Sequence, residues 1–291
     1  KEIIINHNIS LTNNVKAHEI ISQTIHNNTY TSSVPNTELF FSKDEEQKVW
    51  DISVRERYKN GAILTVAPGM KHIKLTKYYN SKPVKINVIE VNQKLNENLS
   101  IKPSLASSQL NRKASIRTIA QKENAIAAIN GSFFKPQTGV PLGTMMIDGD
   151  ILTGPIYNRV ALGITNNSEF KMDRVKLNAL LKAGNTSLKI DNINQPRMLS
   201  TYILVYTEKW GENSPPSPKY GAQIAILDNK IIEVSDGSLP IPKNGYVISG
   251  PRKMLEPFFN EESVELEIKP QNQNWDDVVH IISGGPYLIK N

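Results

Sequence analysis

Hydrophobic and polar residues change their period along this chain, and the change divides it into two regions. Apolar residues in 15–25 recur at nearly helical spacing, and the polar, proline-containing residues 31–36 form a break. Residues 37–58 begin with a helical pattern and are expected to pass into a strand near Ile52 and Val54. We therefore predict a small, partly helical N-terminal extension over residues 1–60.

From residue 61 onward the dominant period is two, as in strands that bury one face. Alternating segments bounded by Pro and Gly predict strands at 62–69 and 84–91. A helix is predicted over 110–123, followed by an apolar strand over 125–129. Tight hairpins are expected at Asp148-Gly149 and at Asp228-Asn229, which lie between apolar segments. The pattern indicates an α+β fold, with a strand-rich, mixed-sheet domain of few helices over residues 61–291.

Composition narrows the class of protein. The 291 residues are 39% hydrophobic and 21% charged, with a net charge of +6 and no cysteine. These values are typical of a globular chain, exclude disulfides and thiol chemistry, and lack the basic block expected of a nucleic-acid partner. No apolar run approaches the 18 residues of a membrane span. Because the chain starts at Lys1, we expect a removed leader and an exported location, in the periplasm, envelope or medium.

Two glycine-centred segments about 150 residues apart are the strongest candidates for a binding site. Asn130-Gly131-Ser132 and Gly284-Gly285 each follow an apolar run, so backbone amides with little side-chain cover would lie at strand ends. Such amides suit an anion or a closely approaching ligand. Two ordinary turns are the alternative. We predict that both segments lie in one pocket.

The motifs of the C-terminal two thirds resemble those of the phosphodiester glycosidase family. The resemblance rests on the following segments, in order: Asn130-Gly131-Ser132-Phe133-Phe134, Pro141-Leu142-Gly143, Ile147-Asp148-Gly149, Arg159, Gly163, Asn194-Gln195-Pro196-Arg197, residues 245–250 and Gly284-Gly285-Pro286. It covers roughly residues 61–291 and departs from the family at Ser132, where a second glycine is expected. The resemblance implies hydrolysis of the bond between a sugar C1 and a phosphodiester oxygen, with an α-N-acetylglucosaminyl group among the candidate sugars.

Such a reaction requires charge stabilisation on the departing phosphate and a carboxylate near the sugar C1. The arginine fork matches phosphate oxygens, which makes Arg159 and Arg197 the candidate clamps. Asp148 is the candidate carboxylate, although an Asp-Gly pair between strands often serves only the turn. Asn130 and Asn194 are candidate substrate ligands together with Gly131, Ser132, Gly284 and Gly285.

No metal is required by these residues, and none is excluded. His7, His18, His26, His72 and His280 do not show a metal-ligand spacing. A divalent ion such as calcium, held by loop oxygens, remains open. His280 is expected to be a structural residue, with a proton shuttle as the alternative.

Two functions from different classes follow. The first is a hydrolase of sugar-1-phosphodiesters in an envelope glycopolymer or glycan, which needs no cofactor, nucleic acid or membrane span. The second is a non-catalytic module that binds phosphoglycan or cell-wall saccharide. A metal-dependent phosphodiesterase is less favoured, because no His/Asp ligand cluster is evident.

Overall fold

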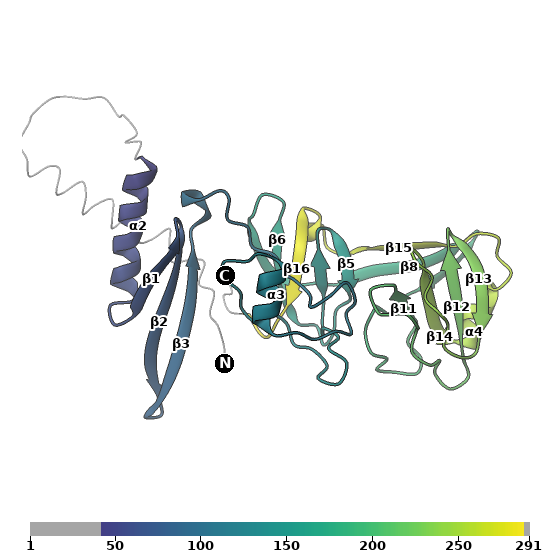
Figure 1. Cartoon of the computed structure of the whole chain (residues 1–291). Coiled ribbons are helices and arrows are strands. Elements are labelled where there is room, and N and C mark those ends of the chain that lie inside the picture. The colour runs from purple at the N-terminus through teal and green to yellow at the C-terminus, as the bar shows by residue number, and fades with distance from the viewer. Residues whose placement is uncertain (1–41, 288–291) are drawn as a thin grey trace, which may run out of the picture. The chain divides into compact units, whose positions relative to one another are not determined.

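The structure, a computed structural model, describes residues 42–287 and divides the chain into two compact units, residues 1–100 and 101–291 (Figure 1). The predicted helical stripe at 15–25 and the break at 31–36 lie outside the described residues. The boundary differs from the one predicted near residue 60, because the strands after that residue pack with the preceding helix rather than with the later sheets.

The first unit consists of one helix and a three-stranded antiparallel sheet. Helix α2 (Lys43–Arg57) begins at a capping box, in which Ser42 and Glu45 satisfy each other's backbone amides. Strands β1 (Ala62–Ala67), β2 (Met70–Tyr79) and β3 (Lys82–Val91) follow in the order β1-β2-β3. The strands predicted at 62–69 and 84–91 are thus confirmed as β1 and β3, except that Pro68 and Gly69 form the turn into β2, which was not predicted.

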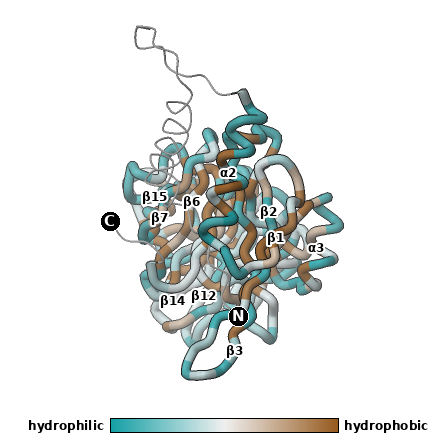
Figure 2. Tube along the Cα trace, turned by 90° about the vertical axis from the view of Figure 1, so that its left-hand side faces the viewer, coloured by the Kyte–Doolittle hydropathy of each residue, from teal (hydrophilic) through white to brown (hydrophobic). Residues whose placement is uncertain are grey.

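The core of this unit lies between the helix and one face of the sheet. Val54 of α2 packs on Ile73 of β2 and Val88 of β3, and Figure 2 shows hydrophobic residues gathered where α2, β1 and β2 meet. The strand predicted near Ile52 and Val54 is wrong. Val54 is buried while Ile52 is 60% exposed, so both belong to the helix, with only one on its apolar face.

The second unit is built mainly from three sheets. The first has the order β5-β4-β16-β6-β7, with β4 (Met145–Ile147), β5 (Asp150–Thr153), β6 (Val160–Thr165), β7 (Phe170–Arg174) and β16 (Val278–Ser283). The C-terminal strand β16 therefore lies at its centre, paired with β4 on one side and β6 on the other.

The second sheet has the order β10-β11-β14-β12-β13, and the third the order β15-β8-β9. Their strands are β8 (Leu177–Ala183), β9 (Thr186–Lys189), β10 (Asn192–Ile193), β11 (Leu204–Thr207), β12 (Gly221–Leu227), β13 (Lys230–Ser235), β14 (Tyr246–Pro251) and β15 (Glu265–Pro270). Only β10 and β11 are a parallel pair among the described strands. The predicted α+β class with mixed sheets is confirmed.

Helices are short in this unit. They are α3 (Ile116–Lys122) and α4 (Arg252–Leu255), with single 3-10 turns at Glu256–Phe258 and Gln273–Trp275. The largest core joins β8, β12, β14 and α4, and includes Leu181, Ile224, Ile248 and Phe258. Trp275 fills a second core under β6 and β16, where a Cβ on Gly163 would lie 2.6 Å from its ring.

Two of the predicted elements are wrong and two hairpins are right. The predicted helix over 110–123 contains α3 only from Ile116, because Leu110 is buried in a loop and donates its amide to the carbonyl of Lys209. Residues 125–129 do not form a strand: they pair with no described strand, and Ile126 is 57% exposed rather than buried on an apolar face. The β4–β5 and β12–β13 hairpins turn at the predicted pairs, and each pair has two positive φ angles.

Candidate functional site

The two glycine segments predicted to share a site meet at the end of β16. The Ser132 hydroxyl donates to the carbonyl oxygen of Ser283 over 2.8 Å. A Cβ on Gly131 would lie 2.5 Å from Ile282 Cδ1, so a larger residue here would require the Ile282 side chain to move. Residues about 150 positions apart are thereby held together, and Phe133 follows directly at this junction.

A pocket of about 380 Å³ opens beside the junction. Its lining includes aromatic rings, two arginines and the backbone of the C-terminal segment, namely Phe133, Tyr157, Arg159, Arg174, Gly285 and Tyr287. Gly285 thus lies at a pocket, as predicted. Gly131 does not line it, so the prediction that both glycine segments lie in one pocket is wrong for this residue.

The guanidinium of Arg159 contacts two aromatic rings. Its Cζ atom lies 4.6 Å from the ring centre of Phe133 and 5.7 Å from that of Tyr157. Its Nη1 atom is buried and has no hydrogen-bond partner. A guanidinium has five donors and no acceptor, so an unpaired one favours an anionic ligand with oxygen acceptors.

The turn that presents Arg159 has an unusual backbone. Tyr157 and Asn158 both have left-handed φ angles, 52° and 50°. Asparagine adopts this region readily, but a bulky tyrosine does so at a cost of about 1 kcal/mol or more. The tyrosine is nevertheless retained with its ring exposed at the pocket. Such outliers are frequent at functional sites, although Tyr220, outside this pocket, has a similar φ angle of 58°.

Arg174 and Tyr287 complete the pocket and were not among the predicted site residues. The Cζ of Arg174 lies 5.9 Å from the ring centre of Tyr287, whose hydroxyl donates to Asp173. This hydrogen bond and that from the Arg174 amide lower the pKa of the Asp173 carboxyl. Arg174 reaches the pocket because it pairs with Val160, the neighbour of Arg159, across β6 and β7. Only the hairpin register could have revealed this.

The other arginine candidate, Arg197, is occupied by the protein itself. Its Nη1 donates to the Tyr202 carbonyl, and its Nη2 donates to the Ser249 carbonyl and hydroxyl over 3.1 and 2.9 Å. Burial lowers the pKa of the guanidinium. These hydrogen bonds connect the loop after β10 to strand β14. Arg197 does not line the Arg159 pocket, and its side chain holds this loop against β14.

Asn194 is likewise part of the scaffold. It is fully buried, its amide donates to the Leu152 carbonyl and the Thr207 hydroxyl, and its Oδ1 accepts from the Thr207 amide. With donors and acceptor all satisfied, the side chain is not available to a substrate. The prediction of Asn194 as a substrate ligand is therefore corrected. Asn130 is exposed immediately before Gly131 and does not line the pocket.

Asp148 lies at the other end of β16. Its amide donates to His280 Nδ1 over 3.1 Å, and its carboxylate is exposed in the β4–β5 turn. Gly284 follows His280 by four residues, a distance of about 13 Å along a strand. The structure therefore does not bring Asp148 to Arg159. Burial lowers the pKa of His280, opposed by the Asp148 charge, so the ring accepts this hydrogen bond as a neutral imidazole.

The amide of Gly284 is not free for an anion. It donates to the Val160 carbonyl over 2.9 Å and extends the pairing of β16 with β6. The prediction that this glycine segment presents open amides is corrected for Gly284. A Cβ at Gly284 or Gly285 would meet nothing within 4 Å, so both glycines leave open space beside the pocket.

Within residues 42–287, no three His, Asp or Glu side chains converge in a way that could hold a metal ion. No helix in the same part of the chain is long and apolar enough to cross a membrane.

Comparison with known proteins supports the fold alone. No protein-family model matches this sequence, and no curated protein matches it either. A crystal structure of a hypothetical protein from Synechocystis is similar over 79% of this chain, with a TM-score of 0.71 and 18% identity. The chain spans only 44% of that protein. The match to a crystal structure from Burkholderia pseudomallei named "Putative exported protein" covers 61% of this chain and 45% of that protein, with a TM-score of 0.47 and 14% identity.

Proposed function

We propose that the unit of residues 101–291 binds a sugar-1-phosphodiester in the Arg159 pocket and hydrolyses the bond between the sugar C1 and the phosphodiester oxygen. The observation that carries this proposal is the Arg159 guanidinium, which contacts two rings and has a buried donor unpaired. A phosphate oxygen is the acceptor that such a group recognises best. The resemblance in motif order supports the choice of substrate class.

The pocket offers complementary contacts for both halves of such a substrate. Arg159 and Arg174 supply positive charge for the phosphodiester. The exposed rings of Phe133 and Tyr157 supply apolar faces on which a pyranose ring can lie. In the reaction, water adds to C1 as the C1–O bond breaks, which releases a reducing sugar and a phosphomonoester. Arg159 would stabilise the charge that develops on the departing phosphate.

If the sugar C1 lies near Arg159, Asp148 is too far away along β16 to supply the carboxylate for this reaction. The Asp173 carboxylate is linked to the pocket through the Tyr287 hydroxyl, which donates to it. Its lowered pKa keeps it ionised near neutral pH. A phosphate leaving group reduces the need for a general acid, so one ionised carboxylate near the sugar C1 is sufficient for the reaction.

A saccharide-binding module without turnover is the second candidate. It is favoured by one observation: no Asp or Glu lines the pocket directly. Both candidates use the same arginines and rings, and differ only in whether water attacks the sugar.

Product analysis distinguishes the two functions. The protein is incubated with an N-acetylglucosamine-1-phosphodiester, with and without chelator, while reducing sugar and phosphomonoester are followed separately. Equal release of both supports C1–O hydrolysis. Release of sugar 1-phosphate would instead indicate P–O cleavage and contradict the proposal, and binding without either product would leave the module as the function.

A further inference from the structure

The β2–β3 ribbon of the first unit carries a second candidate site, remote in sequence from the Arg159 pocket. The two strands pair in register from Met70–Val91 to Tyr79–Lys82, which places alternate residues on opposite faces. The face that packs on α2 contains Ile73 and Val88. We call the opposite side the outer face; its strand residues include His72, Lys74, Thr76, Tyr78, Lys85 and Asn87.

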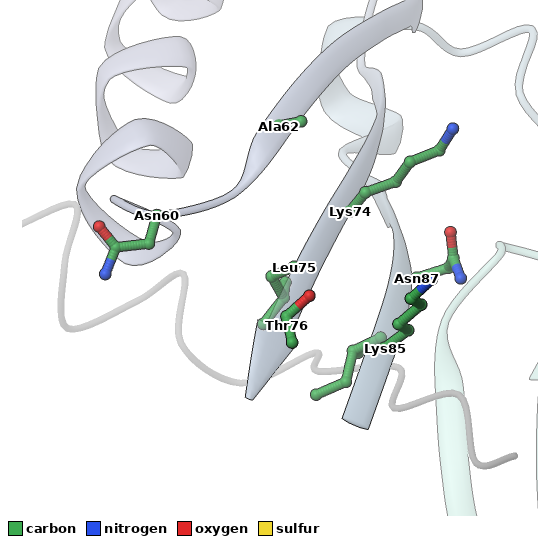
Figure 3. Close-up of a pocket in the computed structure, with 8 residues that line it drawn as sticks. Asn60, Ala62, Lys74, Leu75, Thr76, Lys85 and Asn87 are labelled. Carbon is green, nitrogen blue, oxygen red and sulfur yellow. The ribbon is translucent and has the colours of Figure 1, made fainter. Parts of the chain in front are cut away.

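The outer face concentrates hydrogen-bond donors in a small area. Lys74 lies directly opposite Asn87, and Thr76 lies directly opposite Lys85. The two lysines are therefore diagonal neighbours, with Cα atoms about 7–8 Å apart. Figure 3 shows Lys74 and Asn87 on neighbouring strands, with Thr76 and Lys85 further along the same ribbon. An oxyanion between them could accept from both ammonium groups and from the Thr76 hydroxyl.

A depression of about 350 Å³ accompanies this cluster. It lies where β1 begins, because β1 pairs with β2 only as far as Lys74 and leaves the edge beyond uncovered. Its lining consists of Lys74, Thr76, Lys85 and Asn87 of the outer face, Leu75 and Ile86 of the helix-facing side, and Asn60 and Ala62 (Figure 3).

Charge on the two faces of the sheet is arranged differently. On the helix-facing side, Lys71 forms an ion pair with Asp51 over 2.9 Å and Glu90 pairs with Arg57, whereas Lys77 and Lys82 form no ion pair with a described carboxylate. On the outer face no strand residue is acidic, and no carboxylate within residues 42–287 forms an ion pair with Lys74 or Lys85. Two neighbouring lysines without a counter-charge repel each other, so this face is suited to an external anion.

The chemistry of the partner follows from the exposure of these residues. An exposed lysine holds a single anion weakly, so a surface of this kind retains a ligand that makes several such contacts at once. Only one tyrosine, Tyr78, continues the outer face, with its ring 75% exposed. A nucleic-acid platform needs successive rings for successive bases. The Thr76 hydroxyl and the Asn87 amide nitrogen suit the hydroxyl groups of a sugar or polyol, while Asn87 Oδ1 contacts His72 Nε2 over 3.0 Å.

We propose that the outer face binds a linear, phosphodiester-linked glycan or polyol polymer through Lys74 and Lys85. The choice of polymer rests on the proposed function, whereas the anion site rests on the ribbon itself. Bound in this way, the first unit would raise the local concentration of polymer around the same chain's second unit.

The test uses the full chain and a fluorescent poly(glycerol phosphate), which has phosphodiesters but no sugar C1 to cleave. Binding is measured by anisotropy at low and physiological salt for wild type and for Lys74→Gln/Lys85→Gln. The matched control is Lys77→Gln/Lys82→Gln, which removes the same charge from the opposite face of the same ribbon. We expect about tenfold weaker binding for the first pair and less than twofold for the control.

Equal weakening by both pairs would show diffuse charge attraction and overturn the proposal, as would failure of wild type to bind. Tighter binding of oligo(dT) or of phosphatidylglycerol vesicles through the same lysines would assign the face to a nucleic acid or a membrane instead. Two further measurements separate this proposal from the proposed function. Lys74→Gln/Lys85→Gln should hydrolyse a short sugar phosphodiester at the wild-type rate, and Arg159→Lys should still bind the polymer. Loss of polymer binding in Arg159→Lys would contradict a separate site.

Discussion

Arg159 and Arg197 differ in what their guanidinium groups already contact, and this difference decides their roles. Arg197 donates to two carbonyls and one hydroxyl of the scaffold, while Arg159 lies against two rings with a buried donor unpaired. A phosphate can therefore be bound by Arg159 without breaking a protein contact. The same phosphate could reach Arg197 only by replacing bonds that hold its loop to β14.

Arg197→Lys is expected to destabilise the fold and leave the Arg159 pocket intact. Lysine cannot donate to all three acceptors at once, so one or two buried carbonyls lose a charged donor. The free energy of unfolding should fall by about 1–3 kcal/mol. Thermal unfolding of the variant should show the loss, while its affinity for a sugar phosphodiester at a temperature where it is folded stays within twofold. A folded variant that has lost affinity for the sugar phosphodiester but keeps the wild-type melting temperature would show that Arg197 belongs to the binding site.

Phe133→Leu tests the aromatic support of Arg159. The substitution keeps an apolar side chain of similar bulk but removes the ring face under the guanidinium, an interaction of about 0.5–2 kcal/mol. Affinity for the phosphodiester should fall about 2- to 30-fold, because Arg159 is no longer held in place. Phe134→Leu is the matched control, since Phe134 is equally exposed but does not line the pocket. Equal effects at both positions would exclude a specific role for the Phe133 ring.

At the scale of elements, the central strand β16 runs from the Asp148 turn to the Ser132 segment beside the pocket. Its start contacts the β4–β5 turn through His280 and Asp148, and its end joins the Ser132 segment and the pocket. Local sequence predicted both hairpin turns, because Asp-Gly and Asp-Asn carry their own backbone preference. It could not predict which strand pairs with which, so the separation of Asp148 from Arg159 emerges only from the register of β16.

His280 should make stability depend on pH. Burial lowers the pKa of its ring in the folded protein below its ordinary value of 6.5. The unfolded chain then binds more protons between the two pKa values, so stability is complete above about pH 6.5 and is lost as pH falls below it. The difference between the melting temperatures at pH 7.5 and pH 5.5 should therefore be smaller for His280→Gln than for wild type. An identical pH dependence in both proteins would show that His280 does not contribute.

The whole molecule consists of two units with separate cores, and all residues of the Arg159 pocket lie in the second. Composition and period sufficed to predict the α+β class, because alternation in residues 62–69 and 84–91 is a local property. The boundary at Ser100 was not predictable in the same way. It depends on Val54 packing against Ile73 and Val88. The strands that contain Ile73 and Val88 resemble the strands of the later sheets in sequence, so their pattern does not show which of them pack with the helix.

A chain that begins at Ile101 should fold and retain the pocket. The described cores of the second unit contain no residue from before position 101. We expect a cooperative thermal transition and phosphodiester affinity within about twofold of the full chain. A truncated chain that is soluble but unable to bind would place part of the site in the first unit.

The central claim, that Arg159 recognises a phosphodiester, is tested most directly by calorimetric titration of wild type and Arg159→Lys with an N-acetylglucosamine-1-phosphodiester. Lysine keeps the charge but loses the planar fork and its contact with the two rings. The account predicts binding by the wild type, about 10- to 100-fold weaker binding by Arg159→Lys, and equal melting temperatures for the two proteins. Unchanged affinity in a folded Arg159→Lys protein would contradict the account.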